Sequence, residues 1–259
     1  MDIKSREHKK LRISELNSHT ARNGYREEHL VCNDLNLNME LQNKIIQVTG
    51  RPFDTVSRLK GFNKTDILSA DNILSIQVKK YKQGQFQQLD RHWVNNLIEF
   101  IPELDGIKEL LKNMCEYPLL PDGIHVDKSA STTPLCSTNY SNQVLELFID
   151  TLNDHKRKIL EYAFYGTDLR FRPDYLIGVE HINKKRSKLS FFKIESIINY
   201  LESYTFTIKK SKKVISLGEH NAITLQRTGG DSGKKSSNQL QFKIIISSLK
   251  GHEEFIYTL

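Results

Sequence analysis

Apolar residues recur at helical spacing in several stretches of the chain. Leu30, Val31 and Leu35 follow this spacing, which favours a helix over residues 24–35. The same period predicts further helices over Met39–Val48, Gln88–Phe100, Leu104–Met114, Asn142–Phe164 and Phe192–Leu201. Most of the regular structure expected before residue 204 is therefore helical.

Strands are marked by a shorter period. Asp66–Tyr81 is rich in isoleucine and leucine, alternates imperfectly and is interrupted by Asp71-Asn72, which is typical of a β-hairpin with a tight turn. Further strands are predicted at Tyr175–Val179, Tyr204–Ile208, Val214–Leu217, Ile223–Gln226 and Gln239–Ile246. This order of helices and strands indicates a mixed α/β or α+β fold.

Composition and length fit one globular domain. The chain has 259 residues, of which 38% are hydrophobic and 27% charged, so it can bury a core without metals or disulfides. We expect a single domain over residues 1–259, with residues 1–15 as a loose N-terminal extension. Pro118–Ser141 is rich in Pro, Ser and Thr and predicts a long surface connection, which is uncommon unless it is functional.

Charge and cysteine content narrow the function classes. The formal net charge is +7 and the pI is about 9.1, which favours attraction to a polyanion such as nucleic acid. The three cysteines, Cys32, Cys115 and Cys136, are widely spaced and form no CxxC pair, so we expect a reducing, cytoplasmic (bacterial) environment. The charged N-terminus is no secretory signal, and no stretch approaches the roughly 18 apolar residues of a membrane span.

The predicted hairpin carries a candidate catalytic group. A two-residue turn at Asp71-Asn72 places Asp66 directly opposite Gln77, with side chains about 5 Å apart at Cβ. Lys79 lies two residues further along and shares the face of Gln77. Metal-dependent phosphodiester cleavage needs an anionic oxygen ligand, a means to orient water and a cation near the phosphate. A three-residue turn would break this register.

Gln77 stands where many nucleases have an acid. An amide oxygen can ligate magnesium but brings no charge, so a further carboxylate is expected, and Glu28 on the preceding helix is the candidate. The structural alternative is that Asp66 caps a strand and that Lys79-Lys80 is a solvated strand face. Both interpretations are compatible with the residues alone.

A second acidic arrangement follows in the sequence but is incomplete. Arg172-Pro173-Asp174 supplies a literal Pro-Asp, and Glu180 lies six residues later, but the residue two after Glu180 is Ile182 rather than lysine. Asp174 is better interpreted as opening a strand. The nine histidines form no HxH, HxxxH or HNH pattern, which disfavours a histidine metal site.

Two segments have the composition of a DNA-binding surface. Lys79–Trp93 mixes Lys, Arg, Gln and aromatic residues, and Gln88 is its candidate for a base contact. Ile223–Ile244 flanks a Gly-rich basic loop with strand-like ends. Its candidate phosphate and base contacts are Gln226, Arg227, Lys234, Lys235, Asn238 and Gln241. The structural alternatives are an amphipathic helix start for the first segment and a plain flexible hairpin for the second.

Together these segments resemble a known family. ARNGYREE, KTD followed by IQVKKYKQGQFQQLDRHW, and ITLQRTGGDSGKKSSNQLQFKI are similar to the small type II restriction endonucleases that cut GCGC, and more distantly to those that cut CCGG, within the PD-(D/E)xK superfamily. In this family Ser-Asp or Thr-Asp is followed by Gln-Val-Lys or Asn-Ile-Lys, and this chain has Thr65-Asp66 and Gln77-Val78-Lys79. The tail match also brings in Asp231 and Lys243 as DNA-binding candidates.

The resemblance implies a fold and an activity. The fold is a restriction-endonuclease-like central mixed β-sheet flanked by helices. Asp66, Gln77 and Glu28 would hold Mg²⁺, and Lys79 would orient the attacking water, so that cleavage of double-stranded DNA at a short GC-rich palindrome leaves a 5′-phosphate and a 3′-hydroxyl. A companion DNA methyltransferase and a possible homodimer are implied as partners.

Two departures and two alternatives remain. Ten residues separate Asp66 from Gln77, about half the spacing usual in the family, and the middle of the chain (residues 96–215) matches poorly. A repair or junction nuclease of the same fold would prefer damaged or branched DNA. A non-catalytic DNA-binding protein would retain the basic segments without the Asp66–Gln77–Lys79 group.

Overall fold

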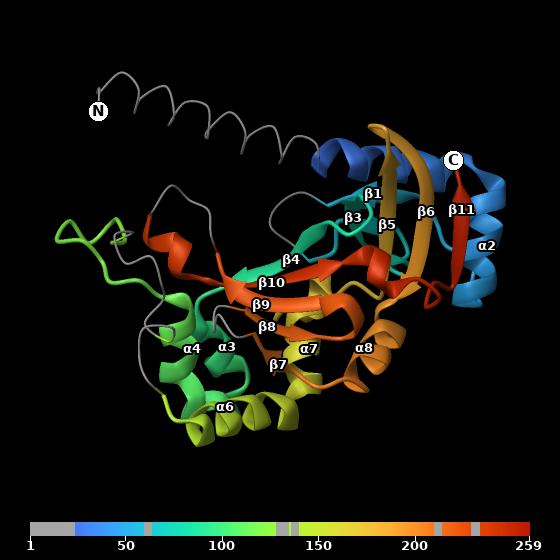
Figure 1. The fold of residues 1–259 in the computed structure, drawn as a ribbon. Coiled ribbons are helices and arrows are strands. Elements are labelled where there is room, and N and C mark those ends of the chain that lie inside the picture. The colour runs from blue at the N-terminus through green and yellow to red at the C-terminus, as the bar shows by residue number, and fades with distance from the viewer. Residues whose placement is uncertain (1–23, 60–63, 128–134, 136–139, 210–213, 229–233) are drawn as a thin grey trace. The chain divides into compact units, whose positions relative to one another are not determined.

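The computed structural model describes residues 24–59, 64–127, 135, 140–209, 214–228 and 234–259. The chain divides into two compact units, whose helices and strands are labelled in Figure 1. The first unit comprises residues 1–82, 171–193 and 253–259, and the second comprises residues 83–170 and 194–252. Each unit is assembled from segments that are separated in the sequence. The single domain over residues 1–259 stays a prediction.

The first unit is built on a mixed six-stranded sheet in the order β1-β2-β3-β5-β6-β11. Its strands are β1 (Val56–Arg58), β2 (Ile67–Ser69), β3 (Ser75–Tyr81), β5 (Tyr175–Ile182), β6 (Lys185–Lys193) and β11 (Phe255–Thr258). Only the pairing of β3 with β5 is parallel. The mixed α/β class and the central mixed sheet expected from the sequence are confirmed.

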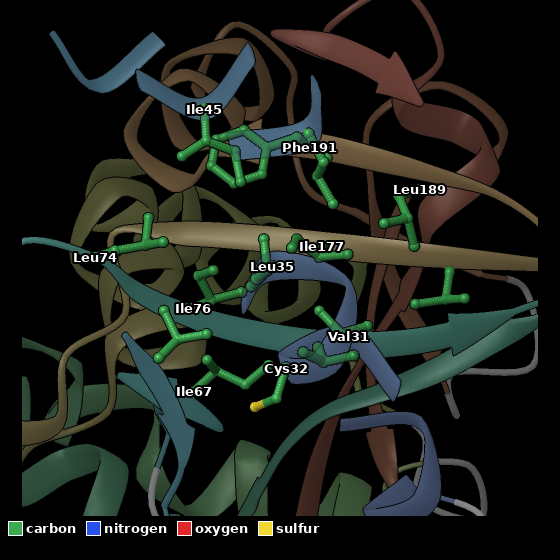
Figure 2. Close-up of a cluster of buried hydrophobic side chains, with 14 residues drawn as sticks. Val31, Cys32, Leu35, Ile45, Ile67, Leu74, Ile76, Ile177, Leu189 and Phe191 are labelled. Atoms are coloured by element: carbon green, nitrogen blue, oxygen red, sulfur yellow. The ribbon is translucent and has the colours of Figure 1, made fainter. Parts of the chain in front are cut away.

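One face of this sheet is covered by helices. Residues 24–37 form a helix, hereafter helix 24–37, and α2 (Met39–Thr49) follows it directly. Figure 2 shows Val31 and Leu35 of helix 24–37 packed with Ile76 of β3 and Ile177 of β5. Burial of these side chains removes apolar surface from water and holds the helix to the sheet.

The hairpin of β2 and β3 keeps the predicted register with a longer loop. The Ser69 N–H donates to the Leu74 carbonyl at 2.9 Å, so the loop spans residues 70–73 instead of two residues. Each strand gives up one residue to the loop, and the pairing of Ile67 with Ile76 is therefore the one that a two-residue turn predicted.

The second unit contains an antiparallel five-stranded sheet in the order β4-β10-β9-β8-β7. Its strands are β4 (Phe86–His92), β7 (Thr207–Ile208), β8 (Val214–Leu217), β9 (Ile223–Arg227) and β10 (Leu240–Ile245). Its helices are α3 (Val94–Phe100), α4 (Lys108–Cys115), α6 (Asn142–Asp154), α7 (Lys156–Tyr165) and α8 (Ile194–Glu202). No helix in the described chain is both long and apolar enough to cross a membrane.

Two helix predictions were wrong at their N-terminal ends. Gln88–His92 lies in β4, paired with β10, and the helix begins only at Val94. Phe192 and Lys193 end β6, and α8 begins at Ile194. In both places a short apolar pattern fits either period. Pairing decides the outcome: β4 pairs with β10, which is distant in the sequence, and the end of β6 pairs with the neighbouring strand β5.

Candidate functional site

Asp66 lies at the end of β2, where the regular pairing of β2 with β3 stops. A regular ladder would place Asp66 opposite Gln77, but the Asp66 N–H donates to the Ile76 carbonyl at 2.8 Å. Its carboxylate then takes the place of a main-chain acceptor, because Oδ2 accepts the Val78 N–H at 2.7 Å. The side chain of Asp66 is thus fixed against β3 between Gln77 and Lys79.

The surroundings of Asp66 disfavour its charge. Burial raises the pKa of the carboxyl to about 6, even though Lys79 and the Val78 N–H act to lower it, and Glu28 raises it further. Nearby positive charge is therefore too small to keep the carboxylate fully ionised at slightly acidic pH. A bound cation would favour the ionised form, because metal ligation and carboxylate deprotonation are coupled.

Gln77 offers a buried oxygen with no internal partner. Its side chain is 2% exposed, and its Nε2 donates to the Lys64 carbonyl at 3.4 Å. Its Oε1 has no hydrogen-bond partner within the described part of the chain, which is costly for a buried acceptor unless something else occupies it. One carboxylate and one unengaged amide oxygen fit a hard divalent cation that prefers oxygen ligands.

Glu28 is held at the same end of the first unit by β1. Its Oε2 forms an ion pair with Arg58 Nη1 at 3.1 Å, and the Arg58 guanidinium stacks over the ring of Tyr25 at 4.7 Å from the centroid. The influence of Glu28 on the pKa of Asp66 places the two carboxylates within electrostatic reach. Gln77 and Lys79 thus flank Asp66 on β3, and the role of Glu28 as a fourth catalytic residue stays a prediction.

The competing Pro-Asp arrangement has a structural use. Ser75 Oγ donates to Asp174 Oδ2 at 2.8 Å and accepts the Asp174 N–H at 3.0 Å, so Asp174 ties the start of β5 to β3. Glu180 is ion-paired with Lys188 at 3.3 Å. Both acids are engaged within the sheet, which supports the interpretation of Asp174 as the residue that opens a strand.

In the second unit, three glutamines from three adjacent strands meet on one sheet face. Gln241 of β10 pairs with Gln226 of β9, and its Nε2 donates to Gln88 Oε1 of β4 at 2.7 Å. Lys243 lies two residues after Gln241 and shares its face. Burial lowers the pKa of this lysine. We call Gln88, Gln226, Gln241 and Lys243 the polar face.

Arg227 points away from the polar face. It follows Gln226 directly and pairs with Leu240, so its side chain leaves the opposite side of β9. Its guanidinium stacks on the ring of Tyr117, 3.6 Å from the centroid, and burial lowers its pKa. Its buried Nη1 has no hydrogen-bond partner among the residues that the structure describes.

Asn238 fixes the backbone of Tyr117. Its side-chain amide donates to the Tyr117 carbonyl at 2.8 Å and accepts the Tyr117 N–H at 3.1 Å. The amide is therefore engaged within the protein in this structure. Through these two bonds Asn238 holds the ring on which Arg227 stacks.

The basic loop presents two exposed lysines. Lys234 and Lys235 are exposed, and the Lys235 N–H donates to the Ile124 carbonyl at 2.7 Å. Lys235 and Asn238 also line a pocket of about 710 Å³ with Trp93, Tyr117 and other residues. Asp231 lies outside the described residues.

Two residues that contact the candidate sites or their supporting elements were not predicted from the sequence. Tyr117 gave no signal, because the stack with Arg227 joins residues far apart in the chain. Glu27 is 3% exposed and lies four and eight positions before Val31 and Leu35, on their buried helical stripe. A glutamate that continues an apolar stripe is a signal that could have identified it.

Comparison with known proteins supplies the family. The R.HinP1I restriction endonuclease family matches residues 42–249, a region that contains Asp66, Gln77 and Lys79 but not Glu28. No curated protein sequence matches the chain. The crystal structure of restriction endonuclease MspI in complex with its cognate DNA aligns with a TM-score of 0.49 and 11% identity, over 79% of this chain and 77% of that chain. The family match covers well over half of the sequence and confirms the resemblance, so the chain belongs to the R.HinP1I restriction endonuclease family of site-specific deoxyribonucleases.

Proposed function

We propose that the protein is a type II restriction endonuclease that hydrolyses double-stranded DNA with Mg²⁺ at the Asp66 site. The observation that carries the proposal is a buried carboxylate whose pKa is raised by its surroundings, held against the strand that supplies Lys79 and the unengaged Gln77 oxygen. This set would provide metal ligands and a cation for a phosphate.

Each residue has a distinct task in this proposal. Asp66 and Gln77 would hold the metal ion, and Glu28 would complete its ligands directly or through water. When bound, magnesium supplies Lewis-acid stabilisation of the charge that develops on the scissile phosphate. The Lys79 ammonium orients the attacking water and contacts that phosphate. Water attacks phosphorus in line with the bond to O3′, and cleavage leaves a 5′-phosphate and a 3′-hydroxyl.

The second unit would bind and read the DNA. Glutamine amides can pair bidentately with adenine, and arginine or lysine with the acceptor edge of guanine, which suits Gln88, Gln226, Gln241 and Lys243 of the polar face. Arg227 lies on the opposite side of β9 and is a separate candidate for such a contact. Lys234 and Lys235 suit phosphates, Asp231 stays a candidate from the family resemblance, and Asn238 supports the Tyr117–Arg227 stack. A GC-rich palindrome of the GCGC kind is the favoured target.

The cellular setting follows from this activity. An endonuclease of this class requires a companion DNA methyltransferase that protects the host genome, and a cytoplasmic location where both meet that genome. A palindromic site suits a two-fold homodimer, although a monomer that nicks each strand in turn would also cleave it.

Digestion of unmethylated phage DNA by the purified protein, with magnesium or with EDTA, tests the proposal. We expect discrete fragments only with magnesium, and sequencing of their ends gives the recognition site and the cut position. A smear, or preference for branched or damaged substrates, would instead identify a repair or junction nuclease. Binding to duplex DNA without cleavage at any magnesium concentration would identify a non-catalytic DNA-binding protein.

A further inference from the structure

Glu27 occupies a buried position among basic groups of the first sheet. Its Oε2 lies 2.9 Å from Nε2 of His181 on β5 and 3.8 Å from Nζ of Lys80 on β3. Its Oε1 lies 2.9 Å from Nε of Arg186 on β6. A buried carboxylate needs such partners, and three strands of the central sheet supply them.

Arg186 fixes helix 24–37 at a second point. Its Nη2 lies 2.5 Å from Oδ2 of Asp34, which follows Glu27 by seven residues and thus about two helical turns. One guanidinium therefore connects two turns of the same helix to β6. Two contacts so spaced fix both the rotation of the helix and its position along its axis.

The rotation of helix 24–37 determines where Glu28 points. Consecutive helical residues are about 100° apart around the axis, so Glu27 faces β5 and β6 while Glu28 faces Arg58 of β1, at the other end of the strand order. Arg58, the ion-pair partner of Glu28, pairs with Ile67, the residue that follows Asp66, so Glu28 is directed toward the end of β2 where Asp66 lies. Loss of the Glu27 contacts would remove one restraint on the rotation of the helix, and with it on the direction of Glu28.

Glu27 also acts on the strand that carries Lys79. Its ion pair with Lys80 holds that side chain on the helix-covered face of β3. Because strand residues alternate, Lys79 then lies on the face of Gln77. The two consecutive lysines of β3 thus lie on opposite faces of the sheet: Lys80 contacts Glu27, and Lys79 is the catalytic candidate.

We infer that Glu27 is a positioning residue that sets the magnesium affinity of the site by fixing Glu28 relative to Asp66. The inference rests on the proposed function, since it takes Asp66 and Glu28 to be metal ligands. Glu27 itself is enclosed by His181, Arg186 and Lys80 and acts only through its neighbours.

The test compares magnesium affinities of purified variants, measured without DNA from the magnesium-dependent rise in melting temperature. Loss of a residue that orients a ligand typically weakens metal binding about 10-fold to 100-fold, and we expect Glu27→Ala to fall in this range. Glu27→Gln should lose less, because its amide oxygen still accepts a hydrogen bond from His181. If Glu27→Ala does not fold, Glu27→Gln is tested alone. A magnesium affinity lowered by about 3-fold or more would support the inference, and an unchanged affinity would contradict it.

A double variant separates positioning from general destabilisation. If Glu27 acts through Glu28, Glu27→Ala should weaken binding no further once Glu28→Gln is present. Arg157→Ala is the matched control, because it removes an ion-pair network with Glu195 and Glu202 in the second unit and should leave magnesium affinity unchanged.

The outcomes separate two kinds of failure. Unchanged affinity in Glu27→Ala and Glu27→Gln, or losses that add in the double variant, would overturn the inference while the proposed function stands. A wild-type protein that binds no magnesium, with or without DNA, would overturn both.

Discussion

The two units differ in the polar groups that they bury. In the first unit the Asp66 carboxyl is buried, and this burial raises its pKa. In the second unit the polar face consists mainly of neutral amides, and the Gln241 amide donates to Gln88. Arg227, half-buried on the other side of β9, is stacked on an aromatic ring. The first unit therefore holds a buried carboxylate whose ionised form is disfavoured, whereas the polar groups gathered on the sheet of the second unit are mainly uncharged.

Of the variants considered, loss of Lys79 should have the largest effect on the cleavage rate. Lys79→Ala should lower the cleavage rate by about 10³-fold, because removal of one group that stabilises transition-state charge costs roughly this much. Specific DNA binding should remain within a few-fold, since the proposed binding residues lie in the second unit. Single-turnover cleavage and equilibrium binding on the same duplex measure the two effects, with Lys184→Ala as the control for loss of an exposed lysine elsewhere in the first unit. Equal loss of binding and cleavage would contradict the role given to Lys79.

The cost of burying Asp66 is the next largest effect. Its pKa is raised from 3.8 to about 6 in the folded protein, so ionisation destabilises the metal-free protein fully above pH 6 and not at all below 3.8. Asp66→Asn should therefore be more stable than wild type at pH 8 by up to about 3 kcal/mol and nearly equal at pH 4. Thermal unfolding in EDTA at the two pH values checks this. Equal stabilities at both would mean that Asp66 is solvated.

The same pKa predicts a pH dependence of metal binding. Magnesium must displace the proton of Asp66, so the affinity of the wild-type protein should fall as the pH decreases through about 6. Titrations between pH 5 and pH 8 measure the trend. An affinity independent of pH in this range would remove Asp66 from the ligand set.

Base reading should be weakened less. Loss of a bidentate base contact costs about 1–3 kcal/mol of discrimination, so Arg227→Leu and Gln226→Leu should each reduce the preference for the cognate site over a single-base variant by about 10-fold or more. Competition binding against both duplexes provides the measurement. A uniform loss of affinity for both duplexes would make these residues phosphate contacts.

The smallest expected effect concerns the exposed lysines of the basic loop. Lys234→Ala and Lys235→Ala should each lower the slope of log affinity against log salt by about 1, without a change in site preference. Lys250→Ala, at an exposed lysine outside the proposed interface, is the control. A change in preference with an unchanged slope would assign base contacts to these lysines.

Local pairing made much of the first unit predictable. The register of the hairpin follows from the position of the turn, and it survived a longer loop because the loop grew by one residue on each side. The helical stripe with Val31 and Leu35 was readable for the same reason. Asp66 was predicted at the correct end of the strand, but its departure from the ladder depends on the side-chain bond to Val78, which no pattern encodes.

Contacts between distant segments account for what was missed. Gln88 meets Gln241 across 153 positions, and Glu27 meets His181 across 154, so neither pair leaves a local pattern. β4 was predicted as helix because its strand character depends on β10. The opposite directions of Gln226 and Arg227, in contrast, follow from strand alternation alone and were available from the sequence.

The central claim is that cleavage depends on Asp66 and not on the Pro-Asp carboxylate at Asp174. The most direct test is digestion of unmethylated DNA with magnesium by wild type, Asp66→Asn and Asp174→Asn, with folding of each variant verified by its melting transition. We predict that Asp66→Asn gives no fragments, whereas Asp174→Asn gives the wild-type pattern. Cleavage by a folded Asp66→Asn protein, together with loss of cleavage in a folded Asp174→Asn protein, would contradict the claim.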